Sequence, residues 1–165
     1  MVTPIEVHFR SDILDMPDHK VMVVEFRGEL DESNIDDTAV QIYKIIADAP
    51  VNTPFIFDFS QLNYMNSKSI GYLSDWFSKI SEKGAELLIA APRENISDIL
   101  RTVGLDNFIK MFHSVDESKL AVLNNGTTEK ATTNMPTQLA DSSNDAQVEK
   151  IIPFTNENNT GSKAA

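Results

Sequence analysis

The sequence lacks cysteine and has no long apolar run. None of its 165 residues is Cys, which excludes disulfide bonds, thiolate zinc sites and cysteine nucleophiles. No apolar run approaches the roughly 20 residues that a membrane-spanning helix needs. The N-terminal residues have neither the basic start nor the apolar centre of a signal peptide. We therefore expect a cytoplasmic protein without a membrane segment.

Basic residues are also scarce. There are 14 Lys and Arg against 25 Asp and Glu, which gives a formal net charge of −11. Such a surface repels nucleic-acid backbones and anionic lipids, so we expect no nucleic-acid and no membrane partner. The three His residues show no ligand spacing, and no glycine-rich phosphate loop or hydrolase arrangement is present. We expect no metal, no cofactor and no enzymatic activity.

The character of the chain changes near residue 124. Apolar residues are dense and periodic before this point, whereas Thr, Asn, Ser, Ala and Gln dominate after it. The later composition cannot bury enough apolar surface to offset the entropy of ordering. We predict a folded domain over 4–124 and a disordered polar tail over 125–165. An apolar island at 148–154 is either a chance cluster, the simpler interpretation, or a short docking motif.

Within the domain, two strand patterns precede an alternation of helices and strands. The segments 5–10 and 21–26 predict a hairpin. Further strands are predicted at 55–59, 86–90 and 108–112. Helical stripes are predicted at Ile35, Ala39, Ile42 and Ile46, at Ile70, Leu73, Phe77 and Ile80, and at Ile96, Ile99, Leu100 and Val103, with a closing helix over 116–123. This order indicates an α/β fold with one mixed sheet of about four to five strands and about four helices.

The most informative segment begins at the apolar run Phe55-Ile56-Phe57, which ends in Asp58. A polar loop is predicted next, and Ser67 stands just before an amphipathic helix. We therefore predict that Ser67 is the helix N-cap, at the positive end of the helix dipole. A phosphate at this end would be stabilised rather than unfold the segment. The residue types alone favour a simple capping role.

Three segments together carry a family resemblance. They are Gly28-Glu29-Leu30-Asp31 after the second predicted strand, residues 58–71, and residues 100–105 with the strand that follows them. They resemble the STAS domain, and within it the bacterial anti-sigma factor antagonists, over residues 4–124. In that family a Gly-Glu-Leu-Asp motif follows the second strand, and the phosphorylated serine directly follows an Asp before a helix.

The resemblance implies that Ser67 is the phosphorylated serine and that Asp31 lies near it. In this chain Asn66 replaces the family's Asp, Lys68 its second Ser or Thr, and Ser69 its first Gly. The partner-binding surface implied by the resemblance comprises Asp31, Asn66, Lys68, Ser69 and Tyr72. Lys68 and Tyr72 are expected on the helix face opposite the apolar stripe, and Gly71 is expected to let this helix approach the sheet closely.

The resemblance also implies a function. The unphosphorylated protein would bind a serine-kinase anti-sigma factor, phosphorylation of Ser67 by that kinase would weaken the complex, and a serine phosphatase would reset it. We expect a monomer. The three replacements leave alternatives open: a STAS partner switch for a non-sigma pathway such as biofilm formation or motility, a scaffold or transporter-associated module that is never phosphorylated, or a module that binds a small ligand or lipid.

Overall fold

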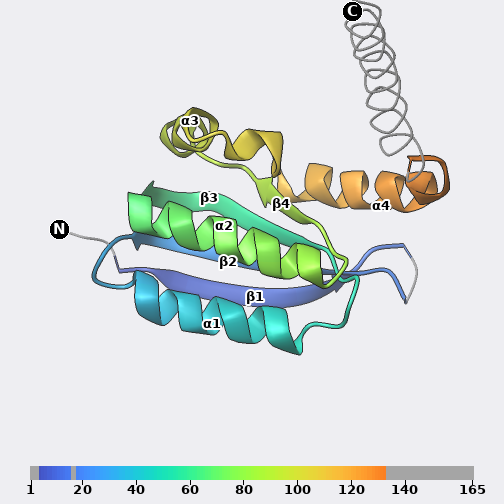
Figure 1. Ribbon diagram of the computed structural model, residues 1–165, viewed down its shortest axis with the longest axis horizontal. Helices are drawn as coiled ribbons and strands as arrows, with labels where there is room; N and C mark the ends of the chain where they lie inside the picture. Colours follow the sequence, from blue (N-terminus) through green and yellow to red (C-terminus); the bar gives the residue numbers. More distant parts are fainter. Residues whose placement is uncertain (1–3, 16–17, 133–165) are drawn as a thin grey trace, which may run out of the picture. The chain divides into compact units, whose positions relative to one another are not determined.

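The computed structural model describes residues 4–15 and 18–132 (Figure 1). The chain divides into two units, the first ending at Leu123 and the second beginning at Asn124. The first unit contains the sheet, and the fold and the sites below belong to it. Within the described residues, no helix has both the length and the apolar character needed to cross a membrane.

The elements of the chain alternate as the sequence predicts. They are β1 (Glu6–Ile13), β2 (Lys20–Leu30), α1 (Ile35–Asp48), β3 (Phe55–Met65), α2 (Ser67–Glu82), β4 (Leu87–Ala90), α3 (Glu94–Thr102), a 3-10 turn (Leu105–Asn107), β5 (Lys110–Phe112) and α4 (Val115–Thr132).

The five strands form one mixed sheet in the order β1-β2-β3-β4-β5. β1 pairs antiparallel with β2, and every later pair is parallel. This arrangement confirms the predicted α/β fold. Because successive parallel strands are also neighbours, right-handed crossovers place α1, α2 and α3 on the same face of the sheet. All three helices contribute to one apolar core, and α1 and α2 lie side by side over it (Figure 1).

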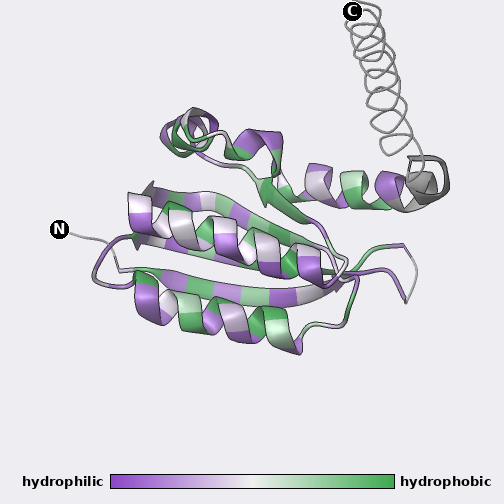
Figure 2. Cartoon of the chain, in the orientation of Figure 1, coloured by the Kyte–Doolittle hydropathy of each residue, from purple (hydrophilic) through white to green (hydrophobic). Residues whose placement is uncertain are grey.

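Aromatic side chains fill the centre of this core. The ring of Phe26 lies 5.2 Å from that of Phe57 and 5.3 Å from that of Phe59. The indole of Trp76 on α2 packs onto the same group, with its ring centre 5.9 Å from that of Phe57. Figure 2 shows short hydrophobic and hydrophilic segments alternating along α1 and α2, as expected of helices with one buried face.

Two strands are longer than the sequence predicts. β2 continues through Gly28, which adopts a φ of 105°, and β3 continues to Met65 instead of ending at residue 59. The polar residues after Phe59 still pair with β2, after a register shift between Glu25 and Arg27. A register shift changes the direction in which the following side chains point. Polar residues can therefore occupy the later part of a strand whose early part is buried.

The buried face of α2 is rotated relative to the predicted stripe. Leu73 and Ile80 are buried as predicted, but Trp76 and Ser69 complete the face, while Ile70 and Phe77 are only half-buried. The indole occupies the aromatic centre of the core, so the helix turns toward it. Gly71 faces solvent, and a Cβ added there meets no atom within 4 Å. The predicted close approach of Gly71 to the sheet is therefore wrong.

The closing helix extends beyond its predicted end. α4 begins at Val115, covers the second apolar cluster with Val115 and Val122, and remains helical through Thr132. The predicted boundary at residue 124 coincides with the division of the chain into two units and lies inside this helix, which continues over residues 125–132. The rest of the predicted tail, including the island at 148–154, lies outside the described residues.

We predict that Gly71→Ala stabilises the protein by about 0.5–1 kcal/mol, because it removes the entropy cost of a glycine in an exposed helix. Urea unfolding followed by circular dichroism measures this change. Gly104→Ala is the matched control, since Gly104 has a φ of 78°, a conformation that strains a side chain, and we expect it to lose stability. A destabilised Gly71→Ala variant would contradict the open environment of Gly71.

We also predict that a chain ending at Thr132 unfolds at nearly the same temperature as the full chain. The residues of both apolar clusters come from positions up to Val122. Thermal unfolding of the two chains should differ by less than about 5 °C, which corresponds to roughly 1 kcal/mol for a domain of this size. A larger fall would show that residues 133–165 stabilise the domain.

Candidate functional site

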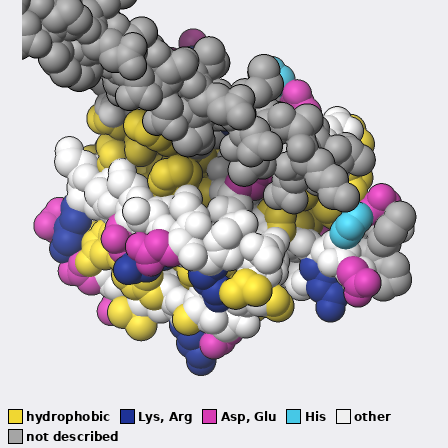
Figure 3. All heavy atoms as spheres, turned by 45° about the vertical axis from the view of Figure 1, so that its right-hand side comes forward, with side chains coloured by type: hydrophobic (Ala, Val, Ile, Leu, Met, Phe, Trp, Pro, Cys, Tyr) yellow, Lys and Arg dark blue, Asp and Glu magenta, His cyan; other side chains and the backbone are white. Residues whose placement is uncertain are grey.

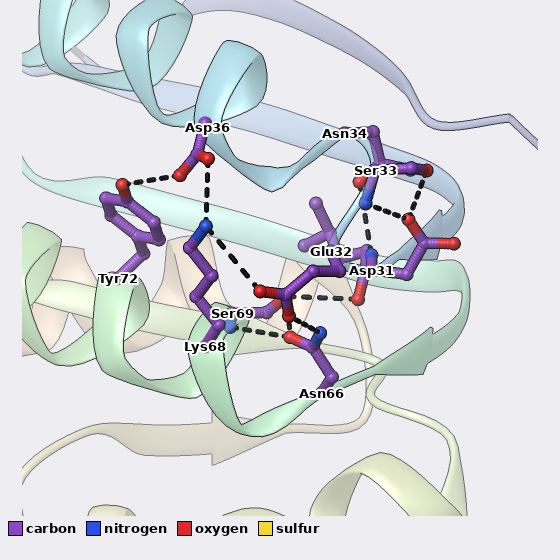
Figure 4. A network of polar contacts seen from close by, with 10 residues as sticks. Asp31, Glu32, Ser33, Asn34, Asp36, Asn66, Lys68, Ser69 and Tyr72 are labelled. Atoms are coloured by element: carbon purple, nitrogen blue, oxygen red, sulfur yellow. Dashed lines mark hydrogen bonds and ion pairs between the residues drawn. The ribbon is translucent and has the colours of Figure 1, made fainter.

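The candidate site lies where β3 passes into α2, beside the connection from β2 to α1 (Figure 4). The parallel pairing of β2 and β3 ends with Leu30 opposite Met65. The backbone N–H of Asn66 then donates to the carbonyl of Leu30 at 3.2 Å. Two segments that are far apart in the sequence, 31–36 and 66–72, therefore meet at this edge of the sheet.

The N-cap of α2 is Asn66, so the prediction that Ser67 caps this helix is wrong. Asn66 Oδ1 accepts a hydrogen bond from the backbone N–H of Ser69 at 2.9 Å. Its Nδ2 donates to Glu32 at 3.2 Å. Asn is as good an N-cap as Ser, and its amide group donates to Glu32 while its oxygen caps the helix. Ser67 is the first residue of the helix.

The two serines of this segment have opposite environments. Ser67 is exposed, and its hydroxyl makes no hydrogen bond within the described part of the chain. Ser69 is fully buried, and its hydroxyl lies 3.0 Å from the carbonyl oxygen of Leu30 and 2.9 Å from Asn66 Oδ1. Ser69 thus ties α2 to β2, and Ser67 is the serine whose hydroxyl is accessible to a reagent or an enzyme.

The carboxylate of Asp31 accepts hydrogen bonds within its own loop. One carboxylate oxygen accepts from both the backbone N–H of Ser33, at 2.8 Å, and the Ser33 hydroxyl. These hydrogen bonds, that of the hydroxyl first, lower the pKa of Asp31. No hydrogen bond joins Asp31 to Ser67 among the described residues. These contacts show that Asp31 starts the loop into α1.

Two other acidic residues, Glu32 and Asp36, reach the start of α2 and were not identified from the sequence. Asp36 accepts from Lys68 Nζ and from the Tyr72 hydroxyl, both at 2.8 Å. Glu32 accepts from the amide of Asn66 and lies 3.9 Å from Lys68 Nζ. The only sequence signal is the acidic run before and within the first turn of α1, and such runs usually serve the helix dipole.

Lys68 and Tyr72 face α1, which corrects the prediction that they lie opposite the buried side of α2. The hydrogen bond from Lys68 is the main cause that lowers the pKa of Asp36, and the bond to Asp36 raises the pKa of both Lys68 and Tyr72. The Tyr72 ring stacks on Trp76, with ring centres 6.1 Å apart. Tyr72 is thus held between the core and Asp36.

A second tyrosine extends this contact between α1 and α2. The ring of Tyr43 meets that of Tyr72 at 6.4 Å, and its hydroxyl donates to Asp75. Burial first, and the bond to Asp75 second, raise the pKa of Tyr43 to about 12. The two helices are therefore joined by polar side chains along their shared groove, beginning beside Ser67.

The electrostatic balance of the site is acidic. Glu32 and Asp36 reach the start of α2, and Lys68 is the cation that pairs with both of them. On the face drawn in Figure 3, basic side chains likewise lie next to acidic ones. Within residues 4–15 and 18–132, no group of His, Cys, Asp and Glu side chains could hold a metal ion. The arrangement presents an exposed hydroxyl at a helix N-terminus, between Asn66 and Lys68, whose side chains contact the carboxylates of Glu32 and Asp36.

The fold is shared with several known proteins. An anti-sigma factor antagonist from Mycobacterium paratuberculosis has 19% sequence identity and a TM-score of 0.58, covering 71% of this chain and 94% of its own. The Bacillus anti-sigma factor antagonist SpoIIAA, in its unphosphorylated form, also has 19% identity, with a TM-score of 0.57 and coverage of 71% and 97%. A murine anion transporter of solute carrier family 26 has 12% identity and a TM-score of 0.61, covering 74% of this chain and 23% of that protein.

These identities establish a common fold and no more. The STAS domain model itself matches residues 13–118, which is well over half of the chain and spans all elements from the end of β1 to the start of α4. The match includes Ser67 and the acidic residues that surround the start of α2. The chain therefore belongs to the STAS domain family.

Proposed function

We propose that this protein is a phosphorylatable switch of the anti-sigma factor antagonist type, which binds a serine-kinase anti-sigma factor while Ser67 is unphosphorylated. The observation that carries the proposal is the contrast between the two serines. The Ser67 hydroxyl is exposed and makes no hydrogen bond among the described residues, whereas Ser69 is buried and bonded. By the family resemblance, Ser67 also occupies the position of the phosphorylated serine.

The proposed switch acts through charge. A phosphate on Ser67 adds about −1.5 to −2 charges to a region that already holds Glu32 and Asp36. In the unphosphorylated protein, a partner can pack against Asn66, Lys68 and the exposed part of α2. In the phosphorylated protein, the same contact would enclose a net excess of negative charge, because the one cation beside it, Lys68, already pairs with Asp36, and such a charge destabilises an interface strongly. The protein is then the substrate of its kinase and of a serine phosphatase, with no catalytic role of its own.

Lys68 is a cation close to Ser67 with which a phosphate could pair. Its ammonium group is bound to Asp36 at 2.8 Å and lies 3.9 Å from Glu32. A phosphate on the neighbouring Ser67 would compete with these carboxylates for the same cation. Phosphorylation would then free Asp36 as well as add its own charge, so the surface presented to the partner would change at more than one residue.

A second candidate function is a scaffold or transporter-associated module that is never phosphorylated. Its support is the likeness to the fold of the murine anion transporter over 74% of this chain. A STAS switch that controls a non-sigma pathway is the third. Mass spectrometry of the native protein separates phosphorylated from unphosphorylated modules. Co-purification with an ATPase-domain kinase supports switching, whereas co-purification with a membrane transporter supports the scaffold.

We predict that Ser67→Ala abolishes phosphorylation by the cognate kinase and leaves partner binding largely intact. Its stability should change by less than about 0.5 kcal/mol, as for most surface substitutions, because Asn66 and not Ser67 caps the helix. Ser67→Asp should keep the fold, since an acid in the first helical turn is favourable, but should weaken the complex. Phosphopeptide mapping and a binding titration measure both effects.

Asn66→Ala is the stability control for this pair. It removes the cap to the N–H of Ser69, so it should cost about 0.5–2 kcal/mol, measured by urea unfolding. A phosphate found on Ser69, or none after kinase treatment, would overturn the assignment of Ser67. Equal binding by Ser67→Asp and the unmodified protein would overturn the charge mechanism.

We further predict that Lys68 lowers the second pKa of a phosphate on Ser67 from its ordinary value of about 6. A nearby cation favours the doubly charged form, so Lys68→Gln should raise this pKa. Phosphorus NMR of the phosphorylated protein across the titration range measures it. Lys79→Gln is the matched control, because Lys79 pairs with Glu82 at the other end of α2. An identical phosphate pKa in both variants would contradict the pairing with Lys68.

A further inference from the structure

Among the residues that the structure describes, the second face of the sheet is only partly covered. The three crossover helices all serve the first core, and the opposite face is apolar around Val21, Val23 and Ile56, where α4 packs. Glu25 follows Val21 and Val23 at a spacing of two residues, which places it on the same face. Beyond it, toward the carboxyl ends of β2 and β3, this face becomes polar.

A hollow of about 350 Å³ lies on this polar part. Its lining includes two arginines, two amides and a carboxylate, from Arg27, Arg93, Gln61, Asn63 and Glu6. The hollow thus holds two of the chain's four arginines, although the chain as a whole is strongly acidic. It lies at the carboxyl ends of the parallel strands, the edge at which α/β sheets commonly bind ligands, and its volume falls in the range of small-molecule sites.

Several donors in the hollow are unused. Arg27 gives its Nε and Nη2 to Glu25, both at 2.9 Å, which leaves Nη1. Arg93 makes one long bond, from Nε to the carbonyl of Ser60 at 3.4 Å, so both of its Nη groups are free of partners among the described residues. The side-chain amide of Asn63 likewise makes no hydrogen bond within the described segments.

This set of groups favours one class of ligand. The guanidinium fork matches the geometry of a phosphate or carboxylate group better than any other side chain does. Glu6, however, brings a carboxylate into the same hollow, and Glu25 already neutralises much of Arg27. A bare anion would therefore be held weakly, whereas a ligand that also offers a hydroxyl or amino group could satisfy Glu6 and Asn63.

We propose that this hollow binds a small organic anion, with a phosphate or carboxylate end on Arg93 and Arg27 and a hydroxyl or amino group toward Glu6. The residues involved come from β1, β2, β3 and the turn before α3. They are distinct from those around Ser67, so this binding site stands or falls independently of the proposed switch.

The test is an NMR titration of the full chain at constant ionic strength, with glycerol 3-phosphate in one series and malate in another, because each carries an anionic end and a hydroxyl group. We expect saturable shifts of the backbone amides of Gly28, Gln61 and Asn63 and of the Arg93 side chain. Saturation by glycerol 3-phosphate alone would indicate a phosphate-bearing ligand, and saturation by malate alone a carboxylate-bearing one. Absence of saturable shifts in both series would overturn the proposal.

Matched variants distinguish binding at this hollow from a general effect of the charge of the protein. Arg93→Gln should weaken binding about tenfold or more, the size expected for a charge-assisted hydrogen bond. Arg101→Gln removes the same charge from α3, where Arg101 is exposed and paired with Asp98, and should leave binding unchanged. Glu6→Gln should narrow the preference for glycerol 3-phosphate over inorganic phosphate, because it removes both a carboxylate that repels a bare anion and the acceptor for the ligand's hydroxyl. Equal losses in Arg93→Gln and Arg101→Gln would contradict a specific site.

Discussion

The parallel pairing of β2 with β3 is the constraint on which the rest of this structure depends. It runs from Met22 opposite Phe55 to Leu30 opposite Met65, with register shifts near Glu25 and Gly28. Its buried side supplies the aromatic core, and its end brings the loop after β2 next to the start of α2. The Ser69 hydroxyl and the Asn66 N–H both bond to the Leu30 carbonyl, so the position of Ser67 is fixed by this strand pair.

A rigid helix start with one free hydroxyl suits regulation by a single charge. Asn66 satisfies the helix end, Ser69 anchors it to the sheet, and neither task requires Ser67. Modification of Ser67 can therefore change the surface without unfolding the domain. The loss of stability is small, because the ion pairs beside Ser67 are exposed and such pairs contribute little to folding. Lys68 and Asp36 are thus free to exchange partners when a phosphate arrives.

Much of the fold could be predicted from the sequence, because apolar periodicity and glycine positions are local signals. The succession of strands and helices along the chain follows from them. The polar half of β3 could not be predicted, since its pairing depends on β2 and on the bulges between them. Trp76 packs against aromatic side chains of the sheet, and the spacing of residues within α2 does not predict this contact.

The site was predicted in part for the same reason. Ser67 stands out locally by its position before an apolar stripe, and its exposure agrees with that reading. The choice of cap between Asn66 and Ser67, and the pairing of Lys68 and Tyr72 with Asp36, are tertiary facts that no spacing within either segment encodes. The acidic run around the start of α1 is visible in the sequence, but only the pairing of β2 with β3 determines which of its residues reach α2.

The central claim is that a phosphate on Ser67 controls association with a kinase-type partner. The most direct measurement is a calorimetric titration of that partner with the full chain, prepared once without phosphate and once fully phosphorylated at Ser67. We expect the phosphorylated chain to bind at least about tenfold more weakly, a difference of about 1.4 kcal/mol in binding free energy. Equal affinities for the two forms would contradict the account.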